Sequence, residues 1–265
     1  MLIGESSRVV EVKSVRDSVA YTVPVWKRAL DITCILLSLP VLVPVGIVIS
    51  LIIKCASPGP VLYLNERVGY RGRRFVCFKF RTMKANADDA IHRRHLATLM
   101  SSNAPMVKMD AKGDPRLIPF GGILRSTGLD ELPQLLNVLG GEMSLVGPRP
   151  CLPYEYDNYL PSQKRRFESL PGLTGLWQVS GKNNTSFSEM IALDIKYAET
   201  KSLWMDLKIM VKTIPALIIQ VIETRQRRKQ ATATQLQGMT AGIAMPSITG
   251  GSSVARTEVR ELVQK

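Results

Sequence analysis

The sequence has few of the residues that build disulfide, zinc or redox centres. Its 265 residues include only two histidines and four cysteines, which lie far apart at Cys34, Cys55, Cys77 and Cys151. Without a CxxC pair or a matching histidine spacing, the cysteines predict neither a disulfide framework nor a zinc site. A reducing compartment is the simplest interpretation. The histidines, at positions 92 and 95, flank two arginines that repel a cation, which argues against a metal site there.

Acidic residues are also in the minority. The chain has 22 Asp and Glu against 35 Lys and Arg, a formal net charge of +13. Charge of this sign suits a nucleic acid, an anionic membrane surface or a phosphorylated substrate. The chain lacks an aromatic-interleaved nucleic-acid motif and a helix-turn-helix pattern, which argues against a nucleic acid partner. It also lacks internal repeats, and its length predicts one main domain.

Charge is absent altogether between Asp31 and Lys54. Residues 30–53 read LDITCILLSLPVLVPVGIVISLII, about the 20 apolar residues that a bilayer-crossing helix requires. A long polar stretch precedes this segment and no small-residue cleavage site follows it, so we do not expect a cleaved signal peptide. We expect a membrane helix over residues 26–55.

Two prolines, Pro40 and Pro44, interrupt this apolar run. Proline removes a backbone donor and clashes with the preceding turn, so we expect a break between helical arms over 26–43 and 44–55. Positive residues flank both ends of the segment, which favours a re-entrant helix that enters and leaves by the cytoplasmic face. A kinked spanning anchor is the alternative, because prolines are tolerated in spanning helices.

The remaining patterns predict a mainly helical α+β protein with amphipathic surface helices. We expect a β-hairpin with strands over 61–64 and 75–80, and helices over 84–101, 154–169 and 186–222, the last with breaks near Lys201 and Pro215. Residues 203–222 suit either a membrane surface or core packing. We interpret 1–25 as a flexible arm, 56–225 as the domain that carries the chemistry and 226–265 as a disordered tail.

The segment 120–149 carries the strongest pattern. Leucines at three- and four-residue steps predict an amphipathic helix that begins near Asp130 and ends at Gly140 and Gly141, with Pro133 in its first turn. The helix start stabilises the charged forms of Asp130 and Glu131, as a nucleophile or metal ligand requires. For the pair considered by itself, helix capping is the competing interpretation.

Five cations stand near this pair in the predicted elements, and each by itself fits a solvated surface charge. Together with two carboxylates, they suit a doubly charged phosphate group and a bridging divalent ion, for which magnesium is the natural choice. A carboxylate that attacks phosphorus needs such neutralisation. The predicted phosphate-binding residues are Lys79, Arg81, Arg116, Arg125 and Arg149, and the predicted metal ligands are Asp130 and Glu131.

Several segments in the same order resemble the monotopic phosphoglycosyl transferases of bacteria. The resemblance covers about residues 26–222 and is carried by KRALDI, SPGPVLYLNERVG, FKFRTM, LRSTGLDELPQLLNVLGGEMSLVGPRP, PGLTGLWQVSGKNN, LDIKYAE and DLKIMVKT. It implies an enzyme of the bacterial inner membrane, with its catalytic domain on the cytoplasmic face. The implied reaction moves a phospho-sugar from a UDP-sugar to undecaprenyl phosphate and releases UMP.

The resemblance also implies roles for single residues. Asp130 matches the aspartate nucleophile, Glu131 assists it and the magnesium, and Arg125 and Arg149 match arginines that contact phosphate. Supporting positions are Asp194 and Gln178, while Arg165 or Arg166 stands in for a basic residue that is common before the Pro-Gly of the family loop.

The short chain is similar to the type that initiates exopolysaccharide synthesis, which uses UDP-galactose or UDP-glucose. The sequence does not determine whether the protein forms a homodimer. The competing hypothesis is a non-catalytic, membrane-bound basic scaffold that binds anionic lipid; it predicts salt-sensitive binding without UMP release.

Overall fold

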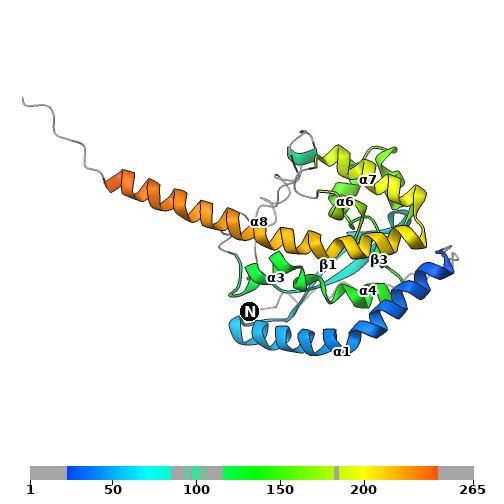
Figure 1. Ribbon diagram of the computed structural model, residues 1–265, viewed down its shortest axis with the longest axis horizontal. Coiled ribbons are helices and arrows are strands. Elements are labelled where there is room, and N and C mark those ends of the chain that lie inside the picture. Colours follow the sequence, from blue (N-terminus) through cyan, green and yellow to red (C-terminus); the bar gives the residue numbers. More distant parts are fainter. Residues whose placement is uncertain are drawn as a thin grey trace, which may run out of the picture.

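The computed structural model describes residues 23–84, 94, 98–100, 102, 105, 116–181 and 185–243, with side chains up to residue 226. The predicted arm before residue 23, most of the predicted helix over 84–101 and the tail beyond 243 lie outside these residues. In the described part, long helices surround two small sheets, so the predicted mainly helical α+β class is confirmed (Figure 1).

The apolar segment forms one long helix, α1 (Val25–Ala56), close to the predicted 26–55. Pro40 and Pro44 lie inside it. The helix bends between two halves (Figure 1) but continues without the predicted break. Two missing backbone donors weaken the helix locally, but the hydrogen bonds of the flanking turns continue on both sides. Within the described residues, α1 is the one helix long and apolar enough to cross a membrane.

The predicted hairpin is present. Strands β1 (Leu62–Val68) and β2 (Arg74–Phe80) pair antiparallel, joined by the short 3-10 turn η1 (Tyr70–Gly72). A second, parallel pair joins β3 (Ser144–Val146) to β4 (Gly172–Thr174). The two sheets come from segments far apart in the sequence, and their strands, together with the loop that follows β3, supply most of the site described below.

Both halves of α1 pack on the same domain. In the first half, Ile35 is buried against Val138, which lies in the helix α4 (Gln134–Gly140), and against Met143, which lies just after that helix. In the second half, Ile49 and Ile53 join a cluster with the hairpin and with α3 (Gly121–Thr127). The two ends of the apolar helix are therefore attached to one folded unit.

The segment around Asp130 differs from its predicted structure. Gly128, with a φ of 77°, ends α3 in a left-handed conformation and leads into the 3-10 turn η3 (Leu129–Glu131). The regular helix α4 begins only after Pro133, although Leu132 and Pro133 already have right-handed helical dihedral angles. The two carboxylates thus lie in a turn before the helix, while the predicted helix end at Gly140 is confirmed.

The C-terminal half is helical with short connections. The predicted helix over 154–169 is divided into α5 (Pro153–Asn158) and the 3-10 segment η4 (Gln163–Glu168), with Pro161 between them. After the short α6 (Leu176–Val179) come α7 (Phe187–Thr200) and α8 (Leu203–Ile243). The predicted break near Lys201 is confirmed. The predicted break at Pro215 is wrong, and α8 also continues past residue 225, where a tail was predicted.

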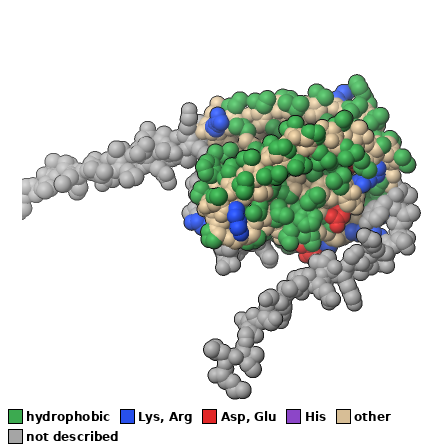
Figure 2. Space-filling view, turned by 90° about the horizontal axis from the view of Figure 1, so that it is seen from below, with side chains coloured by type: hydrophobic (Ala, Val, Ile, Leu, Met, Phe, Trp, Pro, Cys, Tyr) green, Lys and Arg blue, Asp and Glu red, His purple; other side chains and the backbone are tan. Residues whose placement is uncertain are grey.

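Seen from below, the molecule presents an apolar face (Figure 2). Hydrophobic side chains cover most of this face, and the few charged ones sit toward its edges. The exposed hydrophobic residues of α1 include Leu36, Leu37, Val41, Ile47 and Leu51. An apolar surface of this extent is unusual for a soluble monomer and is typical of a protein that contacts a membrane.

Candidate active site

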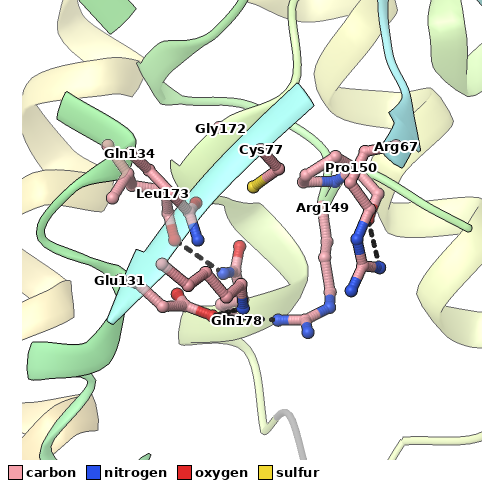
Figure 3. A pocket seen from close by; sticks show the side chains of 10 residues that line it. Arg67, Cys77, Glu131, Gln134, Arg149, Pro150, Gly172, Leu173 and Gln178 are labelled. Atoms are coloured by element: carbon pink, nitrogen blue, oxygen red, sulfur yellow. Dashed lines mark hydrogen bonds and ion pairs between the residues drawn. The ribbon is translucent and has the colours of Figure 1, made fainter. Parts of the chain in front are cut away.

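A small cleft opens between β1, β2, η3, the start of α4, β4, the loop that follows β3 and the segment of Gln178 (Figure 3). Three of the lining residues carry a positive charge and one carries a negative charge. The lining residues are Arg67, Cys77, Lys79, Glu131, Gln134, Arg149, Pro150, Gly172, Leu173 and Gln178. Four of the sequence-predicted site residues, Lys79, Glu131, Arg149 and Gln178, are therefore brought together.

Glu131 is the acidic centre of the cleft. Its Oε1 accepts a hydrogen bond from Lys79 Nζ at 2.8 Å and lies 3.7 Å from Arg149 Nη1. All three side chains are partly exposed, between 16% and 35%, so a ligand can reach them. One carboxylate facing two cations leaves the group positive, which is the charge that a phosphate ligand requires.

The loop that carries Arg149 is held at four consecutive carbonyls. Pro148 O accepts from Gly172 N at 2.9 Å, and Cys151 O accepts from Val68 N at 2.9 Å. The two carbonyls between them accept from guanidinium groups: Arg149 O from Arg166 Nη2 at 3.0 Å and Pro150 O from Arg67 Nη1 at 3.4 Å. Prolines on both sides remove backbone donors, so these outside donors set the position of the loop.

Arg166 reaches this loop from a buried ion pair. Its Nη2 also donates to Asp194 Oδ2 at 2.5 Å, and its Nη1 donates to Tyr159 OH at 2.7 Å. The Arg166 and Asp194 side chains are 2% and 1% exposed. Asp194, a predicted supporting residue, therefore lies outside the cleft and is connected to it through Arg166 and the Arg149 carbonyl. Arg165 instead forms an exposed pair with Glu199.

The other predicted residues take different positions. Asp130 lies beside Glu131 in η3, half-buried, and Arg125 lies in the last turn of α3 before it. Arg116 precedes α3, where its carbonyl accepts from Lys84 N at 2.8 Å. Arg81 is buried and donates to the carbonyls of Ser57 and Pro58 just after α1. None of these four is among the residues that line the cleft.

Sequence reasoning missed six lining residues: Pro150, Gly172 and Leu173, and the three with polar or ionisable side chains, Arg67, Cys77 and Gln134. Arg67 lies between the two predicted strands, Cys77 in a predicted strand and Gln134 in a predicted helix. The only signal was therefore their position beside predicted site residues. Burial raises the pKa of the Cys77 thiol, which keeps it neutral and unsuited to attack. Burial and the neighbouring Arg149 lower the pKa of Arg67, but an arginine still stays charged at neutral pH.

The donor chemistry of η3 fits magnesium. Magnesium prefers oxygen ligands and is commonly held by one or two carboxylates together with phosphate oxygens of a substrate. Asp130 and Glu131 supply two adjacent carboxylates at the positive cleft. Within the part of the chain that the structure describes, no group of three His, Cys, Asp or Glu side chains forms a metal cage of its own.

The chain matches a family of known proteins over most of its length. Residues 22–220 match the family model described as bacterial sugar transferase. The exopolysaccharide production protein ExoY of Sinorhizobium fredii is 38% identical over 193 residues, which cover 73% of this chain and 85% of that protein. The UDP-glucose:undecaprenyl-phosphate glucose-1-phosphate transferase of Caulobacter vibrioides is 38% identical over 224 residues, 82% of this chain and 78% of the relative.

A longer relative matches over the same region. The undecaprenyl-phosphate galactose phosphotransferase of Salmonella typhimurium is 36% identical over 198 residues, 72% of this chain but 40% of that protein. The family match covers α1, η3, the Arg149 loop and most of the ordered C-terminal helices, and so includes every residue of the cleft. The chain is a membrane-associated transferase and belongs to the bacterial sugar transferase family.

Proposed function

We propose that this enzyme transfers a sugar 1-phosphate from UDP-galactose or UDP-glucose to undecaprenyl phosphate and releases UMP, as the first step in assembling an exopolysaccharide repeat unit. The names of the relatives support the substrates. The observation that carries the proposal is the positive cleft in which Lys79 and Arg149 face Glu131, directly beside Asp130. Two substrates that both carry phosphate suit one such cleft.

Asp130 acts as the nucleophile in this proposal. One of its carboxylate oxygens bonds to the phosphorus that carries the sugar, while the bond from that phosphorus to the bridging oxygen breaks. The electron pair leaves with UMP. An oxygen of undecaprenyl phosphate then bonds to the same phosphorus, and the bond to Asp130 breaks, which restores the carboxylate. This double displacement divides one difficult step into two easier steps.

The cations of the cleft make an attack between like charges feasible. Arg149 presents a planar fork to the oxygens of the transferred phosphoryl group, and Lys79 adds a point charge. Both cations face Glu131 in the structure, and this contact orients them toward the cleft. Binding of the donor phosphate then replaces part of that pairing with contacts to the substrate.

Asp130 and Glu131 are the residues that would hold a magnesium ion against the donor diphosphate. When bound, the ion supplies further neutralisation of the phosphate oxygens. Glu131 also keeps Lys79 close to the transferred group through the 2.8 Å hydrogen bond. The two carboxylates thus have separate roles, with Asp130 forming the covalent bond and Glu131 supporting the cation arrangement.

We infer that α1 enters and leaves the membrane by the cytoplasmic face. At its start, Lys27 and Asp31 are buried against the domain, and Lys27 Nζ binds Asp206 Oδ2 at 2.6 Å. At its end, Ile49 and Ile53 pack against the hairpin and α3. Attachment of both ends to one folded unit favours a bent, re-entrant helix whose exposed middle lies in lipid.

The decisive experiment measures UMP release from UDP-galactose and UDP-glucose in membranes, with and without undecaprenyl phosphate and magnesium. Asp130→Asn is expected to abolish turnover, and Asp157→Asn, an exposed aspartate on α5, serves as the matched control. Without the lipid acceptor, a donor labelled in its sugar should leave label attached to wild-type protein but not to Asp130→Asn. Retained turnover in Asp130→Asn would end the nucleophile assignment.

Topology needs a separate probe. Single cysteines placed at both ends of α1, in a background without the native cysteines, are expected to react from the cytoplasmic side only. Labelling of the two ends from opposite sides of the membrane would show a spanning helix and contradict the re-entrant arrangement.

A further inference from the structure

Arg67 is a buried cation at one end of the cleft, and the reaction as described above assigns it no role. It comes from β1 and is 9% exposed, yet it is one of the residues that line the cleft. Its Nη1 donates to Pro150 O at 3.4 Å, a long hydrogen bond, and its Nε has no hydrogen-bond partner among the described residues. Figure 3 shows its guanidinium group beside that of Arg149.

This arrangement leaves the charge of Arg67 without a counter-ion. In the part of the chain that the structure describes, no carboxylate forms an ion pair with it. Glu155 is the acidic group with the strongest influence on the pKa of Arg67, but among the described residues the two side chains form no ion pair. An arginine cannot lose its proton to relieve the cost, so a buried, unpaired guanidinium needs an anionic ligand.

The position of Arg67 indicates which anion it takes. Arg149 lies 3.7 Å from Glu131 and is also the charged group that most affects the pKa of Arg67, whereas Glu131 affects that pKa less. Arg149 therefore stands between Arg67 and the carboxylates, as Figure 3 shows. A diphosphate whose sugar-bearing phosphorus lies at Asp130 and Arg149 can extend its second phosphate toward Arg67.

We propose that Arg67 binds the phosphate that stays with the nucleoside, and so distinguishes the nucleotide donor from the lipid acceptor. This assignment rests on the proposed transferase function. It gives the two arginines different tasks: Arg149 contacts the phosphoryl group that is transferred in both half-reactions, and Arg67 contacts a group that is present only in the first. UMP, which keeps that phosphate, is also a ligand of Arg67.

The test uses the kinetics of the two half-reactions in the full-length, membrane-embedded enzyme. In a double-displacement reaction, kcat/KM for each substrate reports only the half-reaction in which that substrate takes part. Arg67→Gln keeps an amide donor for Pro150 but removes the charge. It is expected to lower kcat/KM for the UDP-sugar by about tenfold or more, the effect of losing one charge-assisted contact, and to leave kcat/KM for undecaprenyl phosphate nearly unchanged.

Three comparisons sharpen the result. Product inhibition by UMP should weaken in Arg67→Gln by a factor similar to the loss in donor kcat/KM. Arg149→Gln should lower kcat/KM for both substrates. Arg74→Gln is the matched control, because Arg74 lies on the same hairpin in an exposed pair with Glu66, and it should change neither value. Arg67→Lys keeps a cation and should recover part of the donor activity.

Stability separates ligand binding from a structural role. Removing an unpaired buried charge should leave the melting temperature of Arg67→Gln equal to or above that of the wild type. Equal losses for donor and acceptor, or no loss for either, would overturn the assignment, as would a fall in stability that Arg67→Lys restores without restoring UMP inhibition. If the wild-type enzyme itself released no UMP from UDP-sugars, the proposed function would fail, whatever the behaviour of Arg67.

Discussion

The buried pair between Arg166 and Asp194 allows the sharpest prediction of stability. Asp194→Asn keeps the size of the side chain but removes its charge, and it leaves the Arg166 guanidinium, 2% exposed, without a counter-ion. Breaking such a buried pair costs about 3–5 kcal/mol. In a folded unit of roughly 200 residues, each kcal/mol lowers the melting temperature by about 2–4 °C. The expected loss is therefore about 6–20 °C.

The same two elements supply a matched control. Arg165 and Glu199 also join η4 to α7 with an N to O distance of 2.5 Å, but their side chains are 56% and 44% exposed. Glu199→Gln should cost no more than about 1 kcal/mol, because solvent screens an exposed pair. The two variants thus compare pairs of equal distance that differ in burial.

The measurement is thermal unfolding of detergent-purified protein at one fixed scan rate, since unfolding of membrane proteins is commonly irreversible. A loss below about 2 °C in Asp194→Asn, or a loss equal to that of Glu199→Gln, would refute the reasoning. Activity provides a second readout. Because Arg166 also holds the Arg149 carbonyl, Asp194→Asn should lower kcat/KM for both substrates at temperatures where the variant is still folded.

Three further predictions concern the membrane helix and the metal. Lys27→Met leaves the buried Asp206 without its partner at 2.6 Å. The melting temperature should fall by about 6–20 °C, and proteolysis at the start of α1 should become faster. Unchanged proteolysis would show that this ion pair does not attach the start of α1 to the domain. Leu37→Lys combined with Val41→Lys puts two charges on the exposed middle of α1. This double variant should increase the fraction of protein that alkaline carbonate extracts from membranes. Lysines at exposed polar positions of α5 should leave that fraction unchanged. Removing divalent ions with EDTA should abolish UMP release, and added magnesium should restore it; activity that survives chelation would argue against the magnesium site.

The sequence by itself determined the features that depend on near neighbours. The apolar run defined α1 almost to the residue, two short β-like runs around a Gly- and Arg-rich turn defined the β1–β2 hairpin, and Gly140 with Gly141 defined the end of α4. These features follow from hydrophobicity, turn chemistry and capping within about ten residues of the chain. The same local patterns, with the resemblance, also selected Glu131, Lys79, Arg149 and Gln178.

Local patterns did not predict whether a proline interrupts a helix, because that also depends on how the neighbouring turns pack. Pro40 and Pro44 predicted a break, and Pro215 predicted another, but all three lie inside continuous helices. Packing of the flanking turns on the domain compensates for the lost backbone hydrogen bonds of α1. At Pro133 the outcome was the reverse, because a predicted helix start became a 3-10 turn that holds Asp130 and Glu131 before the helix.

Only the tertiary structure decided which charges are near each other. Two ion pairs, Lys27 with Asp206 and Arg166 with Asp194, join residues far apart in sequence. The exposed fraction of each of these side chains is 2% or less. Arg67 and Arg149 meet because β1 and the loop after β3 share hydrogen bonds. A sequence pattern records the charge of each residue but not the desolvation and the distance that determine its energy, since both arise only when separate segments pack together.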